Sequence, residues 1–457
     1  MTTLSRRIGE HVAHTRFEQL PREAVEAAKA SLLDALGVSF GASGLGDGVQ
    51  PFIDLALESG GRPEATILGV GAKAPMLMAA LANGALAHAL DFEDAHDEAL
   101  LHPNAQIIPA LLAIAEARGA SGRAFLTALA VGCDLVCRLK LAALTDPADL
   151  GWYPPALLGA IGAAAAAAKL LGATPEGVVD ALSLALGPAA SSAEVKYSPH
   201  SHVRAVRDAF AAHAGLLAAR LAHSGVRGFD RPIEGKAGLY ALYGGGAFDE
   251  AALTADLGGR FEGAHVSFKP WPACRGTHAF IEMALALKAQ HGFRPQDVDA
   301  LTITGGPIQQ MLFEPKAQRL APRTAIDAKF STPFTTALTL VHGEPGLDDY
   351  GPEQLADREV LALAARANCQ IEPDGARPAS WGRLEVRLKD GGAYAASVDY
   401  AFGHPSNPLG WERLVAKFEA CVRYARQPPS PARVARMVDA IAGLDQAGVV
   451  ATALFTD

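Results

Sequence analysis

Apolar residues recur every three or four positions through most of the first ~260 residues, which is the spacing of amphipathic helices packed against one another. A further helix begins at Thr174, which is a suitable N-cap, with Pro175 in its first turn. The segment 155–171 is apolar on nearly every side and predicts a buried helix, whose glycines and alanines allow neighbours to approach closely. The helices predicted in this part span residues 21–36, 74–90, 103–118, 122–139, 155–171 and 204–223.

The pattern changes near residue 263. Residues 298–306 indicate a strand that ends in a turn, and residues 382–398 alternate with period two around Asp390-Gly391-Gly392, which predicts a β-hairpin. Helical spacing returns at 332–341, 357–367, 411–424 and 432–442. We therefore predict a mainly α protein, with a large all-helical domain formed by both chain ends and a smaller α+β domain. The predicted boundaries are 1–263 and 402–457 for the first domain and 264–401 for the second.

Composition narrows the classes of function. The chain has 40 Lys and Arg against 49 Asp and Glu, a net charge of -9, and no basic run, which disfavours a nucleic-acid partner. Its longest uncharged apolar stretch, Pro154 to Ala168, is shorter than the ~20 residues that cross a bilayer. The N-terminus does not resemble a signal peptide, and the five cysteines are too scattered for a disulfide framework. We expect a soluble, cytoplasmic protein of metabolic type with no membrane partner.

Ionisable residues are densest between residues 88 and 103, between two predicted helices. One interpretation is general acid–base catalysis by His102 and Asp91. A second is a metal site formed by His88, Asp91, Asp94 and His96, although this spacing matches no common ligand signature. The third is a solvated acidic loop whose aspartates cap the next helix, and composition alone favours it.

A second cluster lies around Lys269-Pro-Trp-Pro-Ala-Cys274-Arg275. Two prolines impose an extended segment before a helix that begins near Arg275. Backbone N–H groups, Lys269 and Arg275 would then gather at one point, which suits an anionic ligand. The alternative is an ordinary loop with surface cations and an inert, buried Cys274.

A third cluster contains Arg204 and Arg207, three positions apart and hence on one face of a helix. Two guanidinium groups are a natural clamp for a di- or tricarboxylate. Alternatively, the helix face is solvated, with Arg204 and Asp208 as an exposed i,i+4 pair, and the local sequence by itself favours this alternative.

Together these stretches resemble the MmgE/PrpD family over essentially the whole chain. The strongest piece runs from Asn83 to His96 and is followed by His102-Pro103, as in the family pattern N-G-x-x-x-H-x-x-D-[FY]-D-D with a downstream His-Pro. The segment from Lys269 to His278 is similar to the family's K-P-Y-P-x-C-R-x-x-H. Further agreement lies at Gly159–Gly172, Asp327–Ser331, His342-Gly343 and Gly403–Leu409.

The resemblance implies a helical domain with a smaller α+β lid, a homodimer, and an active site in the cleft between the domains that uses neither cofactor nor metal. Known members include 2-methylcitrate dehydratases, cis-aconitate decarboxylases and iminodisuccinate epimerases. Their shared chemistry moves a proton beside a carboxylate of a small polyacid. Such chemistry needs cations for the carboxylates, a base of moderate pKa and an acid.

The resemblance also assigns residues. Asp91, His102 and Lys269 fall on family active-site positions, and Arg275 and His278 fall on the adjoining segment. Among the departures, Tyr153 stands where many members have a catalytic histidine. The family's Lys-x-x-His stretch falls on the Arg204–Arg207 segment, and Ala95 replaces a threonine.

From these positions we expect a lyase or isomerase, 2-methylcitrate dehydratase-like, acting on a small carboxylate substrate. His102 or Tyr153 would move the proton, with Asp91 orienting His102. The substrate carboxylates would be held by cationic side chains, with His278 beside them: Lys269, Arg204, Arg207 and Arg275. Cis-aconitate decarboxylase-like or iminodisuccinate epimerase-like activity, or a non-catalytic polycarboxylate-binding homologue, are the alternatives.

The proposed arginine clamp can be tested on Arg204. We expect Arg204→Ala to weaken binding of citrate-like and succinate-like acids, because the clamp loses one of its two guanidinium groups. Calorimetric titration of both acids against the unaltered protein measures this, and unchanged affinity would contradict the clamp.

Overall fold

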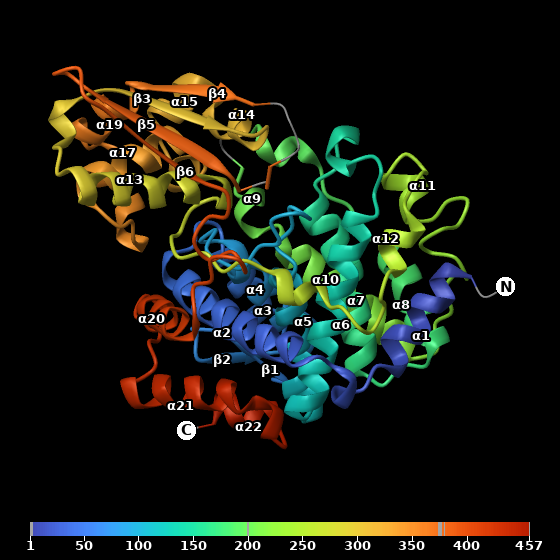
Figure 1. The fold of residues 1–457 in the computed structure, drawn as a ribbon. Helices are drawn as coiled ribbons and strands as arrows, with labels where there is room; N and C mark the ends of the chain where they lie inside the picture. Colours follow the sequence, from blue (N-terminus) through green and yellow to red (C-terminus); the bar gives the residue numbers. More distant parts are fainter. Residues whose placement is uncertain (1–2, 199–200, 373–376, 379, 457) are drawn as a thin grey trace. The chain divides into compact units, whose positions relative to one another are not determined.

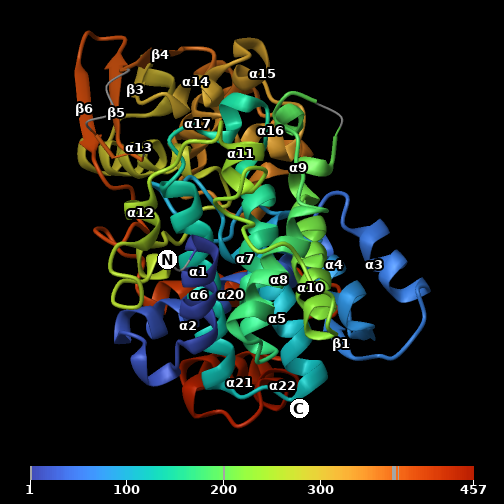
Figure 2. The same cartoon turned by 90° about the vertical axis from the view of Figure 1, so that its right-hand side faces the viewer.

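The computed structural model (Figures 1 and 2) describes residues 3–198, 201–372, 377–378 and 380–456. The chain forms two compact units, Met1–Val266 with Trp411–Asp457 and Ser267–Gly410. No helix in the described ranges combines the length and the apolar character needed to cross a membrane.

The first unit is built of helices, and its centre is α7 (Pro154–Leu170), which is buried from Pro154 to Ala168 as the all-round apolar pattern predicts. Around α7 pack α5 (Asn104–Arg118), α6 (Gly122–Leu141), α8 (Pro175–Leu186) and α10 (Asp208–His223). The other helices of the unit are α1 (Leu4–His14), α2 (Arg22–Leu45), α3 (Gln50–Glu58), α4 (Met76–His88), α9 (Val203–Val206), α11 (Leu239–Tyr243), α12 (Glu250–Thr254), α20 (Trp411–Val422), α21 (Pro431–Ala442) and α22 (Val450–Phe455), with 3₁₀ turns η1 (Phe17–Gln19), η2 (Pro147–Leu150), η3 (Ala193–Lys196), η4 (Glu262–His265) and η8 (Leu444–Gln446).

The helices predicted for this unit are confirmed, including the Thr174 cap, whose side chain accepts a hydrogen bond from the backbone N–H of Gly177. Two features differ from the expectation. The helix predicted over 204–223 is divided at Arg207 into α9 and α10. The unit is also not all-helical, because β1 (Ala65–Ile67) and β2 (Ala72–Ala74) form a small antiparallel sheet. Strands of three residues are too short to show an alternating pattern.

Glycine permits the closest helix crossings of this unit. A β-carbon at Gly215 of α10 would lie 2.6 Å from the Ala163 Cβ atom and 2.7 Å from the Ala160 carbonyl oxygen of α7. One at Gly84 of α4 would lie 2.8 Å from the Asp208 carbonyl oxygen of α10. These contacts are too short for any side chain, so the small residues bring α4, α7 and α10 together.

The second unit combines one sheet with helices that cover it (Figure 1). Strand β3 (Val298–Gly305) pairs in parallel with β4 (Ala367–Ile371) and antiparallel with β5 (Gly382–Leu388), which pairs with β6 (Ala393–Val398). Its helices are α13 (His278–His291), α14 (Ile308–Phe313), α15 (Lys316–Leu320), α16 (Ala325–Lys329), α17 (Thr332–His342), α18 (Pro352–Leu355) and α19 (Arg358–Ala364), with turns η5 (Arg275–Thr277), η6 (Pro295–Asp297) and η7 (Leu347–Tyr350). Apolar side chains of β3, β5, α13 and α17 form its core.

The predicted strand at 298–306 and the hairpin around Gly391, whose φ is 93°, are confirmed. Strand β4 was not predicted, because its short, partly polar sequence follows directly on the apolar spacing of α19.

The C-terminal helix α20 is joined to the N-terminal part of the first unit by a buried cation. The Lys417 ammonium lies 2.6 Å from a carboxylate oxygen of Asp34 on α2. It donates to the Phe92 carbonyl at 2.5 Å and lies 3.8 Å from the centre of the Phe92 ring. One side chain thus connects both chain ends to the loop between α4 and α5.

We expect Lys417→Met to lower the free energy of unfolding by about 3–5 kcal/mol, because it leaves the Asp34 carboxylate buried without its cation. Urea unfolding followed by circular dichroism measures the change. Arg423→Met removes an exposed cation close by in the sequence and serves as the control. Equal midpoints for the two variants would contradict this role of Lys417.

Candidate active site

The ionisable loop between α4 and α5 has a fixed backbone. Helix α4 ends at His88, whose carbonyl accepts a hydrogen bond from the Asp91 N–H at 2.7 Å. Asp91 has φ of 50°, a left-handed conformation that Asp adopts more readily than most residues. His96 and Leu101 then exchange backbone hydrogen bonds of 2.9 and 3.4 Å. The loop therefore turns back over its own start and places its side chains between the helices.

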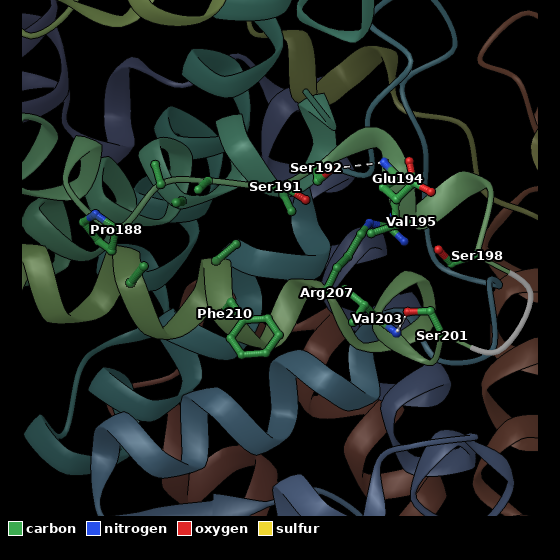
Figure 3. A pocket seen from close by; sticks show the side chains of 16 residues that line it. Pro188, Ser191, Ser192, Glu194, Val195, Ser198, Ser201, Val203, Arg207 and Phe210 are labelled. Carbon is green, nitrogen blue, oxygen red and sulfur yellow. Dashed lines mark hydrogen bonds between the residues drawn. The ribbon is translucent and has the colours of Figure 1, made fainter. Parts of the chain in front are cut away.

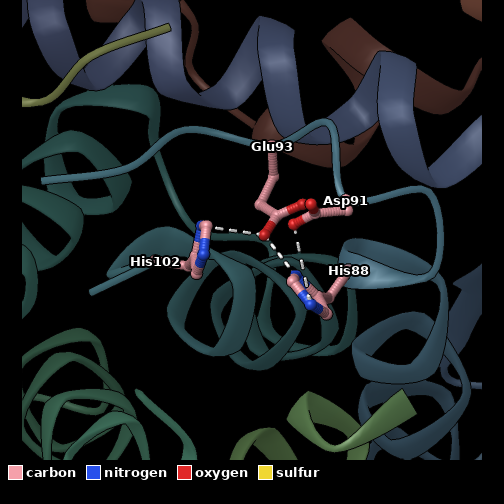
Figure 4. Close-up of side chains that lie close together, drawn as sticks. All are labelled: His88, Asp91, Glu93 and His102. Atoms are coloured by element: carbon pink, nitrogen blue, oxygen red, sulfur yellow. Dashed lines mark hydrogen bonds and ion pairs between the residues drawn. The ribbon is translucent and has the colours of Figure 1, made fainter. Parts of the chain in front are cut away.

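Glu93 stands between two histidines (Figure 4). One of its carboxylate oxygens, Oε1, lies 2.9 Å from Nδ1 of His102 and also pairs closely with Nδ1 of His88. The two imidazole centres are 5.1 Å apart. Glu93 and His88 are each only 1% exposed. Burial strengthens the electrostatic interaction between them, because the effective dielectric constant of a protein interior is low. We call His88, Asp91, Glu93 and His102 the quartet.

The contacts of His102 define its tautomer. Its Nδ1 atom also lies 2.9 Å from the carbonyl oxygen of Asp94. Since both Nδ1 partners are acceptors, Nδ1 carries the hydrogen, and Nε2 of the neutral ring keeps its lone pair. The His102 side chain is 17% exposed, against at most 2% for the other three members of the quartet. His102 Nε2 is thus the quartet's best-placed atom for exchanging a proton with a small molecule.

Arg207 provides the positive charge next to the quartet. Its Nη2 atom lies 3.4 Å from Nδ1 of His88 and 3.7 Å from a carboxylate oxygen of Asp208. Its Nη1 atom donates to the Arg204 carbonyl at 2.6 Å, and the guanidinium lies 4.9 Å from the centre of the Tyr153 ring. Burial, followed by the Arg207 charge, lowers the pKa of His88, with Glu93 acting in the opposite direction. His88 is therefore neutral near neutral pH.

The structure corrects the expected surface pair of Arg204 and Asp208. Both residues are buried, and Asp208 accepts a hydrogen bond from the Gln106 side chain at 2.5 Å. The Gln106 side chain can reach Asp208 because it passes Gly159 of α7, which has no side chain. A β-carbon at Gly159 would lie 2.5 Å from the Gln106 side chain. The helix break at Arg207 means that the two arginines do not lie on the face of one continuous helix.

The contacts of the 88–103 loop differ from two interpretations of the sequence. Glu93 places a carboxylate oxygen 2.9 Å from His102 Nδ1, and the turn at Asp91 puts an Asp91 carboxylate oxygen 3.9 Å from His88 Nε2. That Asp91 also orients His102 stays a prediction. The metal set considered as the second interpretation differs from the described cluster at Asp94 and His96. Asp94 accepts from Asn104 at 2.6 Å, and His96 faces Glu262 at 3.3 Å, so neither belongs to the described cluster.

Glu93 is the residue that sequence reasoning missed. It lies within the acidic part of the family pattern, which is the only signal that could have singled it out. Its separation of five residues from His88 is not a helical spacing, so only the turn after α4 brings the two together.

The quartet could also hold a cation. Four ligand atoms, one from each residue, lie within 4.8 Å of one another. Two imidazoles and two carboxylates are a donor set that suits zinc or another divalent transition metal. The guanidinium of Arg207 opposes this, because its positive charge lies beside His88.

The remaining predicted residues belong to the second unit. The Lys269 side chain is completely buried. Arg275 donates to the carbonyls of Phe402 and Ala401 at 2.7 and 2.8 Å, and His278 Nε2 lies 3.0 Å from the Ala273 carbonyl. These contacts attach the segment before α13 to the residues that follow β6. The sequence analysis did not assign this structural role. That these residues meet the quartet in one cleft stays a prediction.

Two models of known protein domains match this chain. Residues 6–251 match the MmgE/PrpD N-terminal domain, and residues 271–441 match the MmgE/PrpD C-terminal domain. The chain belongs to the MmgE/PrpD family. The quartet and Arg207 lie in the matched N-terminal domain, and Lys269 lies just before the matched C-terminal domain.

Curated relatives indicate the kind of chemistry. Human cis-aconitate decarboxylase is 26% identical over 411 residues, which cover 87% of this chain and 83% of that protein. A cis-aconitate decarboxylase of Aspergillus terreus is 25% identical over 457 residues, covering 94% and 90%. The cis-aconitate decarboxylase-like protein oryM of Aspergillus oryzae is 26% identical over 407 residues, covering 83% and 82%. These relatives support an enzyme of the lyase kind for this MmgE/PrpD protein.

Asp94, in the loop between α4 and α5, is a buried carboxyl whose pKa affects the stability of the fold. Complete burial, and then the negative charge of Asp34, raise its pKa from 3.8 to about 6. The folded state thus binds more protons than the unfolded state between these values, so this carboxyl makes the protein less stable as the pH rises through that window.

We expect Asp94→Asn to remove the loss of folding stability that the Asp94 carboxyl causes as the pH rises. Relative to the unaltered protein, the variant should gain on the order of 2 kcal/mol between about pH 4 and about pH 7. Urea unfolding at the two pH values measures the difference. A constant gap between the two proteins across this range would show that Asp94 does not titrate there.

Proposed function

We propose that this MmgE/PrpD protein is a lyase that moves a proton beside a carboxylate of a small di- or tricarboxylic acid, with decarboxylation of a cis-aconitate-like acid as the leading reaction. The observation that carries the proposal is the buried Glu93 carboxylate shared by His88 and His102, with Arg207 beside it. The names of the relatives favour decarboxylation over the dehydration that motif resemblance put first. Dehydration and epimerisation stay as alternatives that use the same proton transfer.

Decarboxylation leaves an electron pair on carbon, and that carbon must receive a proton as carbon dioxide departs. His102 in its protonated form supplies this proton from Nε2, while Glu93 holds the ring through Nδ1. Cationic side chains stabilise the enolate-like charge that spreads onto the remaining carboxylate. Arg207 supplies part of that field, and Lys269 supplies a further cation, as the family resemblance implies.

Tyr153 is the alternative proton donor. It immediately precedes α7, and its ring lies under the guanidinium of Arg207 and 5.5 Å from the Lys196 ammonium. Its place at a family histidine position supports a role in the same step.

The wider setting is also part of the proposal. The second unit would close over the substrate as a lid and exclude water, and Arg204 and Arg207 would contact substrate carboxylates. The protein would act as a cytoplasmic homodimer without a cofactor. These features rest on the family resemblance.

The central test is His102→Ala. We expect turnover of cis-aconitate to fall by ~10²–10⁴, with little change in fold, because the proton donor is lost. Release of carbon dioxide and incorporation of deuterium from deuterated water measure turnover. His223→Ala, at the exposed end of α10, is the matched control. Full activity in His102→Ala would remove this residue from the mechanism.

A metal-assisted reaction is the second candidate, favoured by the compact donor atoms of the quartet. Elemental analysis of purified protein separates the two. A stoichiometric divalent metal whose removal abolishes turnover would replace proton transfer from His102 by metal catalysis. A protein that neither turns over these acids nor exchanges their protons would instead be a binding homologue.

A further inference from the structure

A cavity of about 330 Å³ lies between α7, α10 and residues of the segments 188–198 and 201–203 (Figure 3). This volume is within the range of ~300–1,000 Å³ that is typical of small-molecule sites. Neither His88 nor His102 lines it, so it is distinct from the quartet.

The walls of the cavity are largely apolar. Ala156 and Ala160 of α7 and Ala211, Ala214 and Phe210 of α10 form much of its surface. Phe210 is 55% exposed although it is aromatic, and it borders this space. Four serines also line it: Ser191, Ser192, Ser198 and Ser201. Such a lining favours a ligand with an apolar chain and few polar groups.

Arg207 is the only cation among the described lining residues, and one of its donors has no partner there. Its side chain is 1% exposed, and in the described part of the chain its Nε atom has no hydrogen-bond partner. A buried N–H without an acceptor is unfavourable by ~1–3 kcal/mol, more for a charged group. One N–H of this lining residue therefore has no acceptor among the described residues. Among the lining residues that the structure describes, Glu194 is the one other charged residue, and it is exposed.

We propose that this cavity binds a carboxylate that carries an apolar chain, with a carboxylate oxygen accepting from Arg207 Nε and the chain lying along the alanines of α7 and α10. Arg207 also contacts His88, so a ligand here is coupled to the quartet. The chain can belong to the substrate itself or to a second molecule. The coupling to catalysis rests on the proposed function, but binding does not.

The test uses sodium acetate, butyrate and hexanoate as probes, with 1-hexanol as the uncharged comparison. Calorimetric titration of the 457-residue chain should show affinity rising by roughly fourfold for each buried methylene, and weaker binding of the alcohol. Equal affinities for acetate and hexanoate, or equal affinities for hexanoate and hexanol, would overturn the proposal.

Variants then locate the site. Ala214→Leu and Ala156→Leu fill the cavity from two different helices, and each should weaken hexanoate binding at least tenfold while circular dichroism stays unchanged. Ala222→Leu, on α10 but outside the cavity, is the matched control and should bind normally. Hexanoate binding that survives in a folded cavity variant would place the ligand elsewhere and overturn the proposal.

Kinetics distinguish the two sources of the chain. Competitive inhibition of cis-aconitate turnover by hexanoate would assign the cavity to the substrate. A change in kcat at constant KM would assign it to a second molecule acting through Arg207. Absence of turnover would refute the proposed function alone, since the titrations do not depend on it.

Discussion

The first unit is organised around a buried carboxylate that two imidazoles share. Glu93 accepts from Nδ1 of both His88 and His102, and it can do so only because the loop after α4 reverses direction at Asp91. An ionised carboxylate at this depth requires positive charge or hydrogen-bond donors nearby. Arg207 and the two rings provide them, so the positions of all four groups depend on one another.

This arrangement is held by packing at a distance from it. Gly84, Gly159 and Gly215 let α4, α7 and α10 approach until Gln106 reaches Asp208 and Arg207 reaches His88. Lys417 of α20 donates a hydrogen bond to the Phe92 carbonyl and pairs with Asp34 of α2, so it links the loop after α4 to both helices. Close helix packing and one buried ion pair thus set the geometry of the quartet.

Arg207 contributes to both the proposed active site and the proposed ligand cavity. One edge of its guanidinium faces His88 and Asp208, and its face covers Tyr153. Arg207 also lines a largely apolar cavity. A planar group with five N–H donors can serve several partners at once, which lysine cannot. The same side chain therefore joins the proposed proton transfer to the proposed ligand cavity.

The sequence by itself determined the helices, the strand at 298–306, the hairpin at 382–398 and the family, because these depend on local periodicity, turn residues and ordered motifs. It also singled out Asp91, His102 and Arg207 as candidates. Only the tertiary structure decided that Glu93 contacts His102, that Asp208 is buried beside Arg207, and that a cavity borders Arg207. Those facts depend on a left-handed turn, a break between two helices and glycine crossings, which bring together side chains that no local spacing relates.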